Sequence, residues 1–165
     1  MSESTFMPYI KQLVPDEWPV LRDMRLAALR ESPHSFLSTY EKEEAFDEPK
    51  WRAEFGRGDW TVSLQDDEPA GIVGCTREVG APAYERYLEY IWVAPRWRNT
   101  GVARHMLTVV LDRLRASGVR TAYLWVLDGN DAAVRLYKGV GFISSNHRQP
   151  ARPGRTEELM QFNLG

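Results

Sequence analysis

The sequence contains very little cysteine, since Cys75 is the single one among 165 residues. One thiol can form neither an intrachain disulfide nor a cysteine-rich metal cluster. No candidate base accompanies it in the pattern, so we interpret Cys75 as a small buried side chain in a strand. His34, His105 and His147 lack the spacing of metal ligands. We therefore expect no metal cofactor.

Long hydrophobic runs and an excess of positive charge are also absent. No run approaches the roughly 18 consecutive apolar residues of a membrane span. The polar start of the chain lacks the basic-then-apolar pattern of a signal peptide. With 21 basic and 23 acidic residues, the net charge is −2, which disfavours a nucleic acid or an anionic membrane as partner. We expect a soluble cytoplasmic protein.

A chain of 165 residues with 43% hydrophobic residues can bury one core, so we expect a single domain spanning residues 1–165. Periodicity and turn residues predict the order strand, two helices, three strands, helix, strand, helix and two strands. That order implies an α/β (α+β) fold, a mixed sheet with helices on both faces. The strands are expected at 6–13, 60–65, 71–79, 84–93, 121–127, 142–146 and 157–164, and the helices at about 16–31, from Pro49, from Gly101 to just before Gly118, and at 131–140.

Two of these elements carry a specific prediction of burial. The strand at 121–127 is apolar at nearly every position, which is typical of an inner strand covered on each side. The first helix is expected to bury a face that carries Val20, Met24, Ala27 and Ala28.

The junction between the strand that ends at Val93 and the following helix has the features of an anion site. The first N–H groups of a helix have no internal partner, and the macrodipole favours a negative charge there. Arg98 and Arg104 add positive charge, while Gly101 and the nearly as small Ala103 allow the backbone to approach a ligand closely. The expected ligand is a pyrophosphate.

Two common nucleotide-binding patterns do not occur at this junction or elsewhere in the chain. They are the dinucleotide pattern G-x-G-x-x-G and the phosphate-loop pattern G-x-x-x-x-G-K-(S/T). Their absence disfavours a Rossmann oxidoreductase or a nucleotide hydrolase. The alternative to a pyrophosphate site is a plain basic helix start that the side chain of Asn99 or Thr100 caps.

Two segments resemble motifs of the GNAT (GCN5-related N-acetyltransferase) superfamily. Residues 98–103 resemble its acetyl-CoA signature (R/Q)-x-x-G-x-(G/A), and a Val-Ala-Pro turn precedes them. Asn99 stands where many members have glycine, but asparagine tolerates unusual backbone angles better than most residues. The second segment resembles N-x-x-A-x-x-x-Y-x-x-x-G-(F/Y), with matches at Asn130, Ala133, Tyr137, Gly141 and Phe142.

The resemblance implies a GNAT-type fold, with a mostly antiparallel sheet of about seven strands. It implies an acetyl-CoA-dependent N-acetyltransferase that acetylates a primary amine and needs no metal. Direct attack in a ternary complex is expected, because no cysteine or serine nucleophile is patterned for a covalent intermediate. By the same resemblance, the residues that contact acetyl-CoA are Ile91, Trp92, Val93, Arg98, Asn99, Thr100, Gly101, Val102, Ala103, Arg104, Asn130, Ala133 and Tyr137.

The resemblance also suggests two catalytic residues. Glu89 would accept the ammonium proton, and its aromatic neighbours would limit its solvation and favour the protonated form; the alternative is an outward-facing strand glutamate. Tyr137 would lie near the sulfur of CoA and protonate or hydrogen-bond the leaving thiolate; the alternative is a plain core tyrosine. Asn130 either binds the pantetheine arm or caps its helix. Ile91 and Val93 are expected to offer main-chain groups to the pantetheine amides, with the arm lying like an extra strand.

The acyl acceptor is less determined. By resemblance, residues 25–40 and the acidic stretch at 41–48 would wall its site, and an acidic wall attracts cations. We expect a small amine, polyamine or amino-acid-like acceptor. Arg148, Arg152 and Arg155 either recognise an acceptor carboxylate or are simply solvated.

Two rival functions stay open. One is a non-catalytic acyl-CoA-binding module that keeps the loop without turnover. The other is a protein or peptide N-acetyltransferase, which a wide groove rather than a closed pocket would favour. A homodimer is compatible with the resemblance.

Overall fold

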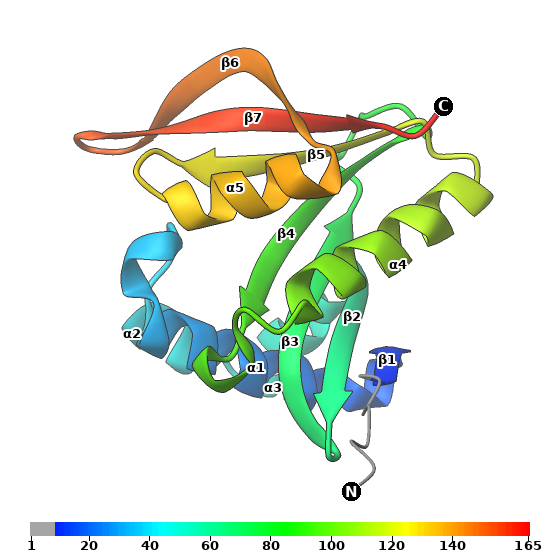
Figure 1. The fold of residues 1–165 in the computed structure, drawn as a ribbon. Helices are drawn as coiled ribbons and strands as arrows, with labels where there is room; N and C mark the ends of the chain where they lie inside the picture. The colour runs from blue at the N-terminus through cyan, green and yellow to red at the C-terminus, as the bar shows by residue number, and fades with distance from the viewer. Residues whose placement is uncertain (1–8) are drawn as a thin grey trace, which may run out of the picture.

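The computed structural model describes residues 9–165, and their strands form one seven-stranded sheet (Figure 1). The strand order is β1-β2-β3-β4-β5-β7-β6, and every neighbouring pair is antiparallel except β4 and β5. The predicted mixed, mostly antiparallel sheet is confirmed; the part of the first predicted strand at 6–8 lies outside the described residues. The strands are β1 (Tyr9–Gln12), β2 (Gly58–Gln65), β3 (Glu68–Thr76), β4 (Glu85–Val93), β5 (Thr121–Leu127), β6 (Ile143–Arg152) and β7 (Arg155–Asn163).

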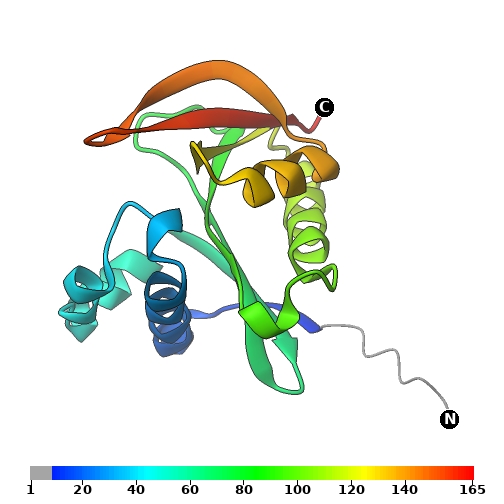
Figure 2. The same ribbon diagram turned by 60° about the vertical axis from the view of Figure 1, so that its left-hand side comes forward.

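Helices cover the sheet on both faces, as predicted (Figure 2). One buried cluster lies between α4, α5 and the sheet, and a second lies between α1, α3 and the strands β2 to β4. Within residues 9–165, no helix is both long enough and apolar enough to cross a membrane. The α-helices are α1 (Trp18–Glu31), α2 (Tyr40–Glu44), α3 (Glu48–Phe55), α4 (Val102–Ala116) and α5 (Asp131–Val140), and short 3-10 turns lie at η1 (Pro15–Glu17), η2 (Pro33–Ser35) and η3 (Pro95–Trp97).

The sheet opens between β4 and β5, and this opening positions the candidate site. The two parallel strands pair only from Glu85 to Tyr87 on β4 and from Thr121 to Tyr123 on β5. Beyond that point β4 continues beside β3, whereas β5 continues beside β7. Tyr90 has a φ of 57°, at an irregularity in the β3–β4 ladder, and such bulges bend a strand. The carboxyl-terminal halves of β4 and β5 therefore diverge.

The predicted face of α1 is partly wrong. Met24 and Ala28 are buried, but Ala27 is exposed and Val20 is only half-buried. The buried stripe follows the helical repeat through Leu21, Met24, Arg25, Ala28 and Leu29. Arg25 occupies an apolar position because the carboxylate of Glu43 on α2 pairs with it.

Several element boundaries also differ from prediction. β3 begins at Glu68 rather than at residue 71, because Asp66 and Asp67 both adopt positive φ and make a tight hairpin turn. Val79, predicted at the end of this strand, is fully exposed. β6 extends to Arg152, beyond the expected 142–146. Its later residues are too polar to be predicted as a strand, but they pair with β7. The short α2 was not predicted.

The prediction that the strand at 121–127 is covered on each side is wrong. Ala122, Leu124 and Val126 are buried in the α4–α5 cluster, but Tyr123 and Trp125 on the other face are half-exposed. Among residues 9–165, the helices α1 and α3 pack over β2 to β4 rather than over this face of β5. Of these two aromatic side chains, Tyr123 stacks on Tyr87, and Trp125 lines the cavity described below.

Candidate active site

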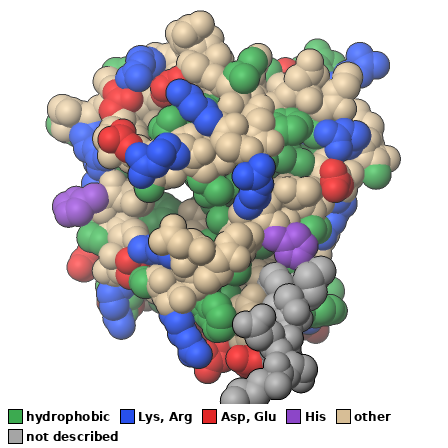
Figure 3. Space-filling model, viewed as in Figure 1, with side chains coloured by type: hydrophobic (Ala, Val, Ile, Leu, Met, Phe, Trp, Pro, Cys, Tyr) green, Lys and Arg blue, Asp and Glu red, His purple; other side chains and the backbone are tan. Residues whose placement is uncertain are grey.

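A cavity of about 740 Å³ lies where β4 and β5 diverge. Its walls are β4, the loop before α4, α5, the end of β5 and the segment that follows α1. Figure 3 shows a hollow near the middle of this face of the molecule. Every residue that the motifs predicted at the site lines the cavity except Thr100. The sequence-predicted residues that line it are Glu89, Ile91, Trp92, Val93, Arg98, Asn99, Gly101, Val102, Ala103, Arg104, Asn130, Ala133 and Tyr137.

The loop before α4 presents a row of unpaired backbone amides. Within residues 9–165, no N–H group from Asn99 to Arg104 has an acceptor in the protein, and the helical ladder begins with His105 donating to the Gly101 carbonyl. Asn99 and Gly101 have φ values of 60° and 86°, the left-handed conformation that these two residue types tolerate best. A run of free amides at a helix start is an anion site.

The alternative of a side-chain cap at this helix is wrong. The N-cap residue is Gly101, which has no side chain to cap with. The Thr100 hydroxyl donates to the carbonyl of Trp97 instead, and Thr100 is outside the cavity wall.

The two arginines of the loop differ in their surroundings. Arg98 pairs with Glu31 of α1 at 2.6 Å and donates to the Val93 carbonyl at 3.0 Å. Burial works to raise the pKa of Glu31, but hydrogen bonds from Arg98, Ser32 and Trp92 outweigh it and hold that pKa at about 2. Arg98 thus ties the loop to α1 with its charge compensated. Arg104 donates to the neutral carbonyl of Gly139 at 3.0 Å, so its charge stays available at the amide row.

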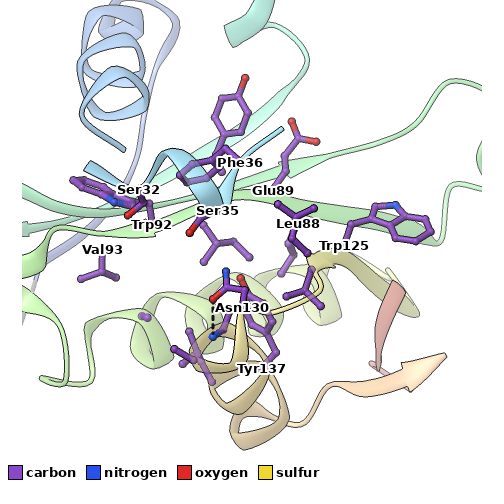
Figure 4. A pocket seen from close by; sticks show the side chains of 18 of the residues that line it. Ser32, Ser35, Phe36, Leu88, Glu89, Trp92, Val93, Trp125, Asn130 and Tyr137 are labelled. Carbon is purple, nitrogen blue, oxygen red and sulfur yellow. Dashed lines mark hydrogen bonds between the residues drawn. The ribbon is translucent and has the colours of Figure 1, made fainter. Parts of the chain in front are cut away.

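Glu89 lies in a charged network rather than in the apolar surroundings that its aromatic neighbours suggested. Its side chain is 29% exposed, and it accepts hydrogen bonds from Arg57 at 2.8 Å and from the Thr76 hydroxyl at 3.3 Å. Arg57 also pairs with Glu54 of α3. Glu89 and Leu88 leave β4 in opposite directions (Figure 4), as alternation along a strand requires. The carboxylate therefore reaches the cavity from the α3 side.

Tyr137 and Asn130 lie on the α5 side of the cavity, across from Leu88 and Ser35 (Figure 4). Tyr137 is 7% exposed and belongs to the α4–α5 cluster, so it is a core residue as well as a wall residue. Burial raises the pKa of the Tyr137 hydroxyl. The Asn130 side chain accepts a hydrogen bond from the Ala133 amide at 3.3 Å and caps α5.

The segment predicted to wall the acceptor side contributes Arg25, Ser32, Ser35, Phe36 and Leu37. Arg25 holds this wall together. Its guanidinium forms paired hydrogen bonds of 3.0 Å with Glu43 and lies 3.8 Å from the ring centre of Tyr90 and 4.9 Å from that of Phe36.

The prediction that the acidic stretch at 41–48 forms part of this wall is wrong. None of its residues lines the cavity. Glu43 faces inward only to neutralise Arg25, while Asp47 caps α3 and Glu48 pairs with Arg52 on the surface. These carboxylates serve local structure.

The three arginines near the β6–β7 hairpin are neither free nor in the cavity wall. Arg148 pairs with Asp128, while Arg152 and Arg155 donate to the carbonyls of Phe36 and His34. They join the hairpin to the segment after α1. Within residues 9–165, no group of His, Cys, Asp or Glu side chains is arranged to hold a metal ion.

The structure adds wall residues that the motifs did not indicate, notably Arg57, Trp125 and Glu157. Arg57 is distant from the motifs in sequence, and no pattern indicated that it would line the cavity. Trp125 could have been found as a bulky residue on the second face of an apolar strand. Glu157 reads as an ordinary charged residue at the start of a strand.

The cavity combines free backbone amides at a helix start, two diverging strands and a carboxylate. Comparisons with known proteins then identify the family. A sequence profile described as the Acetyltransferase (GNAT) family matches residues 21–142. The chain therefore belongs to the GNAT acetyltransferase family, which confirms the resemblance seen in its motifs.

Individual relatives agree with this assignment. The chain is 38% identical over 83 residues to a mycothiol acetyltransferase of Nocardiopsis dassonvillei, a match that covers 50% of this chain and 22% of that protein. It is 38% identical over 72 residues to the N-alpha-acetyltransferase RimI of Mycobacterium tuberculosis, covering 44% of each. These matches thus span less than half the length of either relative.

A solved structure shares the whole fold. The acetyltransferase-fold protein yncA of Salmonella typhimurium, whose structure holds acetyl-CoA, superposes with a TM-score of 0.78 at 16% identity and covers 96% of this chain and 95% of that one. An acetyltransferase of the GNAT family from Streptococcus pneumoniae superposes equally well, with a TM-score of 0.78 at 20% identity over 96% of this chain and 100% of that one, so the seven-stranded open sheet with helices on both faces is that of GNAT proteins.

Proposed function

We propose that this protein is an acetyl-CoA-dependent N-acetyltransferase that acetylates the primary amine of a small molecule by direct attack in a ternary complex. The observation that carries the proposal is the continuous cavity that joins the unpaired amides of residues 99–104 to the carboxylate of Glu89. The amide end of the cavity suits the diphosphate of the co-substrate, and the Glu89 end suits the amine of the acceptor.

The residues present fit acetyl-CoA as the co-substrate. The amide row and Arg104 would bind the pyrophosphate, and the space in front of Gly101 is open, since a Cβ there would meet nothing within 4 Å. β4 has no strand partner on its β5 side beyond Tyr87. Main-chain groups of Ile91 and Val93 on that edge would pair with the pantetheine amides as an added strand does. The acetyl-CoA of the yncA structure supports the same use of this fold.

Acetyl transfer needs a neutral attacking nitrogen and a stabilised leaving thiolate, and the site has a group for each. The attacking nitrogen must be neutral, and Glu89 accepts its proton directly or through a water molecule. The nitrogen then bonds to the thioester carbon, the bond from that carbon to sulfur breaks, and the second proton that the nitrogen loses ends on the sulfur, so that CoA leaves as its thiol. An ordinary tyrosine is protonated at neutral pH, since its pKa is about 10, and burial raises the pKa of Tyr137 further. Its hydroxyl can therefore donate a hydrogen bond to the departing thiolate.

The joined walls of the cavity favour a small acceptor over a polypeptide. Arg152 and Arg155 bind the carbonyls of Phe36 and His34, so the β6–β7 hairpin and the segment after α1 are tied together beside the site. A polypeptide lying across the site would have to displace these bonds. One similar protein is named a mycothiol acetyltransferase and another an N-alpha-acetyltransferase. Proteins similar to this chain in sequence are therefore named for both classes of acceptor.

A thiol-release assay with acetyl-CoA tests the proposal. Small primary amines should release CoA faster than peptides with free amino-terminal residues, and acetate should not compete with acetyl-CoA for binding. Tight acetyl-CoA binding without release of CoA in any mixture would support the non-catalytic module. Faster turnover of peptides would support the polypeptide acetyltransferase.

We further propose that residues 1–165 form one domain, which the single sheet shared by both buried clusters supports. A cytoplasmic location and a homodimer stay predictions from the sequence.

A further inference from the structure

Glu157 is a buried carboxylate of the cavity wall that has no cationic partner among residues 9–165. Its residue is 7% exposed, and its side chain accepts one hydrogen bond, from the Gln149 amide at 2.7 Å. A buried carboxylate is costly unless a cation or several donors compensate it. Gln149 supplies a neutral donor, which leaves the negative charge of Glu157 largely uncompensated.

The cations nearby are already engaged. Arg25 pairs with Glu43, and Arg57 pairs with Glu54 and Glu89. On the neighbouring hairpin, Arg152 and Arg155 donate to backbone carbonyls after α1. The protein itself therefore offers no free cation to this side of the cavity within the described residues.

The sheet register separates Glu157 from the proposed reaction centre. Glu157 is paired with Leu127 at the end of β5, whereas Glu89 lies on β4, two residues beyond the last β4–β5 pair. In a regular sheet, two strand spacings and two residues along the strand would separate them by about 12 Å, and the divergence of β4 from β5 beyond Tyr87 makes the separation larger. Trp125, on the strand β5 that lies between their two strands, also lines the cavity. Aromatic rings stabilise both methylene groups and cations.

We propose that Glu157 binds a second cationic group of the acceptor, apart from the amine that is acetylated, so that the preferred acceptor is a diamine-like small molecule. This inference rests on the proposed function and specifies its acceptor. The reacting amine lies near Glu89, the carbon chain crosses Trp125, and the distal ammonium pairs with Glu157.

The test compares two acceptors that differ only in the second charge, hexamethylenediamine and hexylamine. With wild-type protein, KM for the diamine should be about tenfold below KM for the monoamine. This difference is the effect expected of one charge-assisted hydrogen bond. Glu157→Gln should raise KM for the diamine about tenfold, with little change in kcat. KM for hexylamine should change less than about twofold, since that acceptor has no distal charge.

Glu158→Gln provides the matched control. Glu158 follows on the same strand, points to the other face and pairs with Arg148 outside the cavity wall. This variant should leave the KM of both acceptors unchanged. If Glu157→Gln affects both acceptors equally, or neither, or if wild type does not distinguish them, the inference is overturned.

Failure of the proposed function can be told apart from failure of this inference. If acetyl-CoA binds but no amine releases CoA, the proposed function fails. Calorimetry of hexamethylenediamine and hexylamine with the acetyl-CoA-bound protein then tests Glu157 without turnover. Tighter diamine binding that Glu157→Gln abolishes supports the inference, and equal binding of both amines overturns it.

Discussion

Two glycines at opposite ends of α4 allow the phosphate-binding role of the loop to be separated from its stability. Gly101 and Gly118 both have a φ of 86°, and a Cβ at either would meet nothing within 4 Å. Alanine at either position therefore costs only the left-handed backbone penalty, about 1–2 kcal/mol. For a domain of this size, that lowers Tm by roughly 2–8 °C. Gly101→Ala and Gly118→Ala should show the same loss in thermal unfolding.

Their effects on acetyl-CoA should differ. A methyl group on Gly101 enters the open space before the amides of 99–104, where we place the diphosphate. Gly118 lies beyond the far end of α4, whose 15 residues span roughly 22 Å, and it is outside the cavity wall. Gly101→Ala should raise the Kd for acetyl-CoA at least about tenfold, the equivalent of one lost charged hydrogen bond.

Isothermal calorimetry with acetyl-CoA measures this difference. Gly118→Ala should bind acetyl-CoA as wild type does, which controls for the shared loss of stability. Equal affinities in the two variants would refute the assignment of the amide row to the diphosphate.

Three further substitutions test individual side chains. Tyr137→Phe should lower kcat about tenfold or more with little change in acetyl-CoA affinity, and wild-type activity would leave Tyr137 as a core residue only. Glu89→Gln should lower kcat and change its pH profile, and an unaltered profile would remove Glu89 from the role of base. Glu31→Gln should lose about 1 kcal/mol of stability at neutral pH, because the ion pair is partly exposed and screened. The folded pKa of Glu31, about 2, lies below the ordinary 4.5, so this contribution is complete above about pH 4.5 and disappears as the pH falls toward 2. Denaturant unfolding that shows the same difference at pH 7 and pH 2 would contradict that account.

The loop of free amides before α4 was predictable because its geometry is local. A strand end, a left-handed Asn99 and Gly101 and a helix start lie within a dozen residues, so chain connectivity alone brings the free amides together. The α5 segment was predictable for the same local reason, because Asn130 caps the helix that places Tyr137 in the cavity wall.

Partners that are distant in sequence could not be predicted. Glu89 meets Arg57, which lies 32 residues away, and Arg25 meets Glu43 across a separation of 18 residues. Because of these ion pairs, Glu89 lies in a charged network instead of the expected apolar surroundings. The stretch at 41–48 likewise does not form the expected acidic wall of the cavity. Nothing in composition or periodicity says which charges will meet.

The sequence by itself determined the family, the order of the strands and the turn of free amides before α4, because each depends on short motifs or on local periodicity. Only the tertiary structure decided that β4 and β5 diverge, that α1 and α3 do not cover the second face of β5, and that Glu157 is buried with no cationic partner in the part of the chain that the structure describes. Strand register and the packing of α1 and α3 over one half of the sheet set these features. Both depend on contacts among residues far apart in the chain.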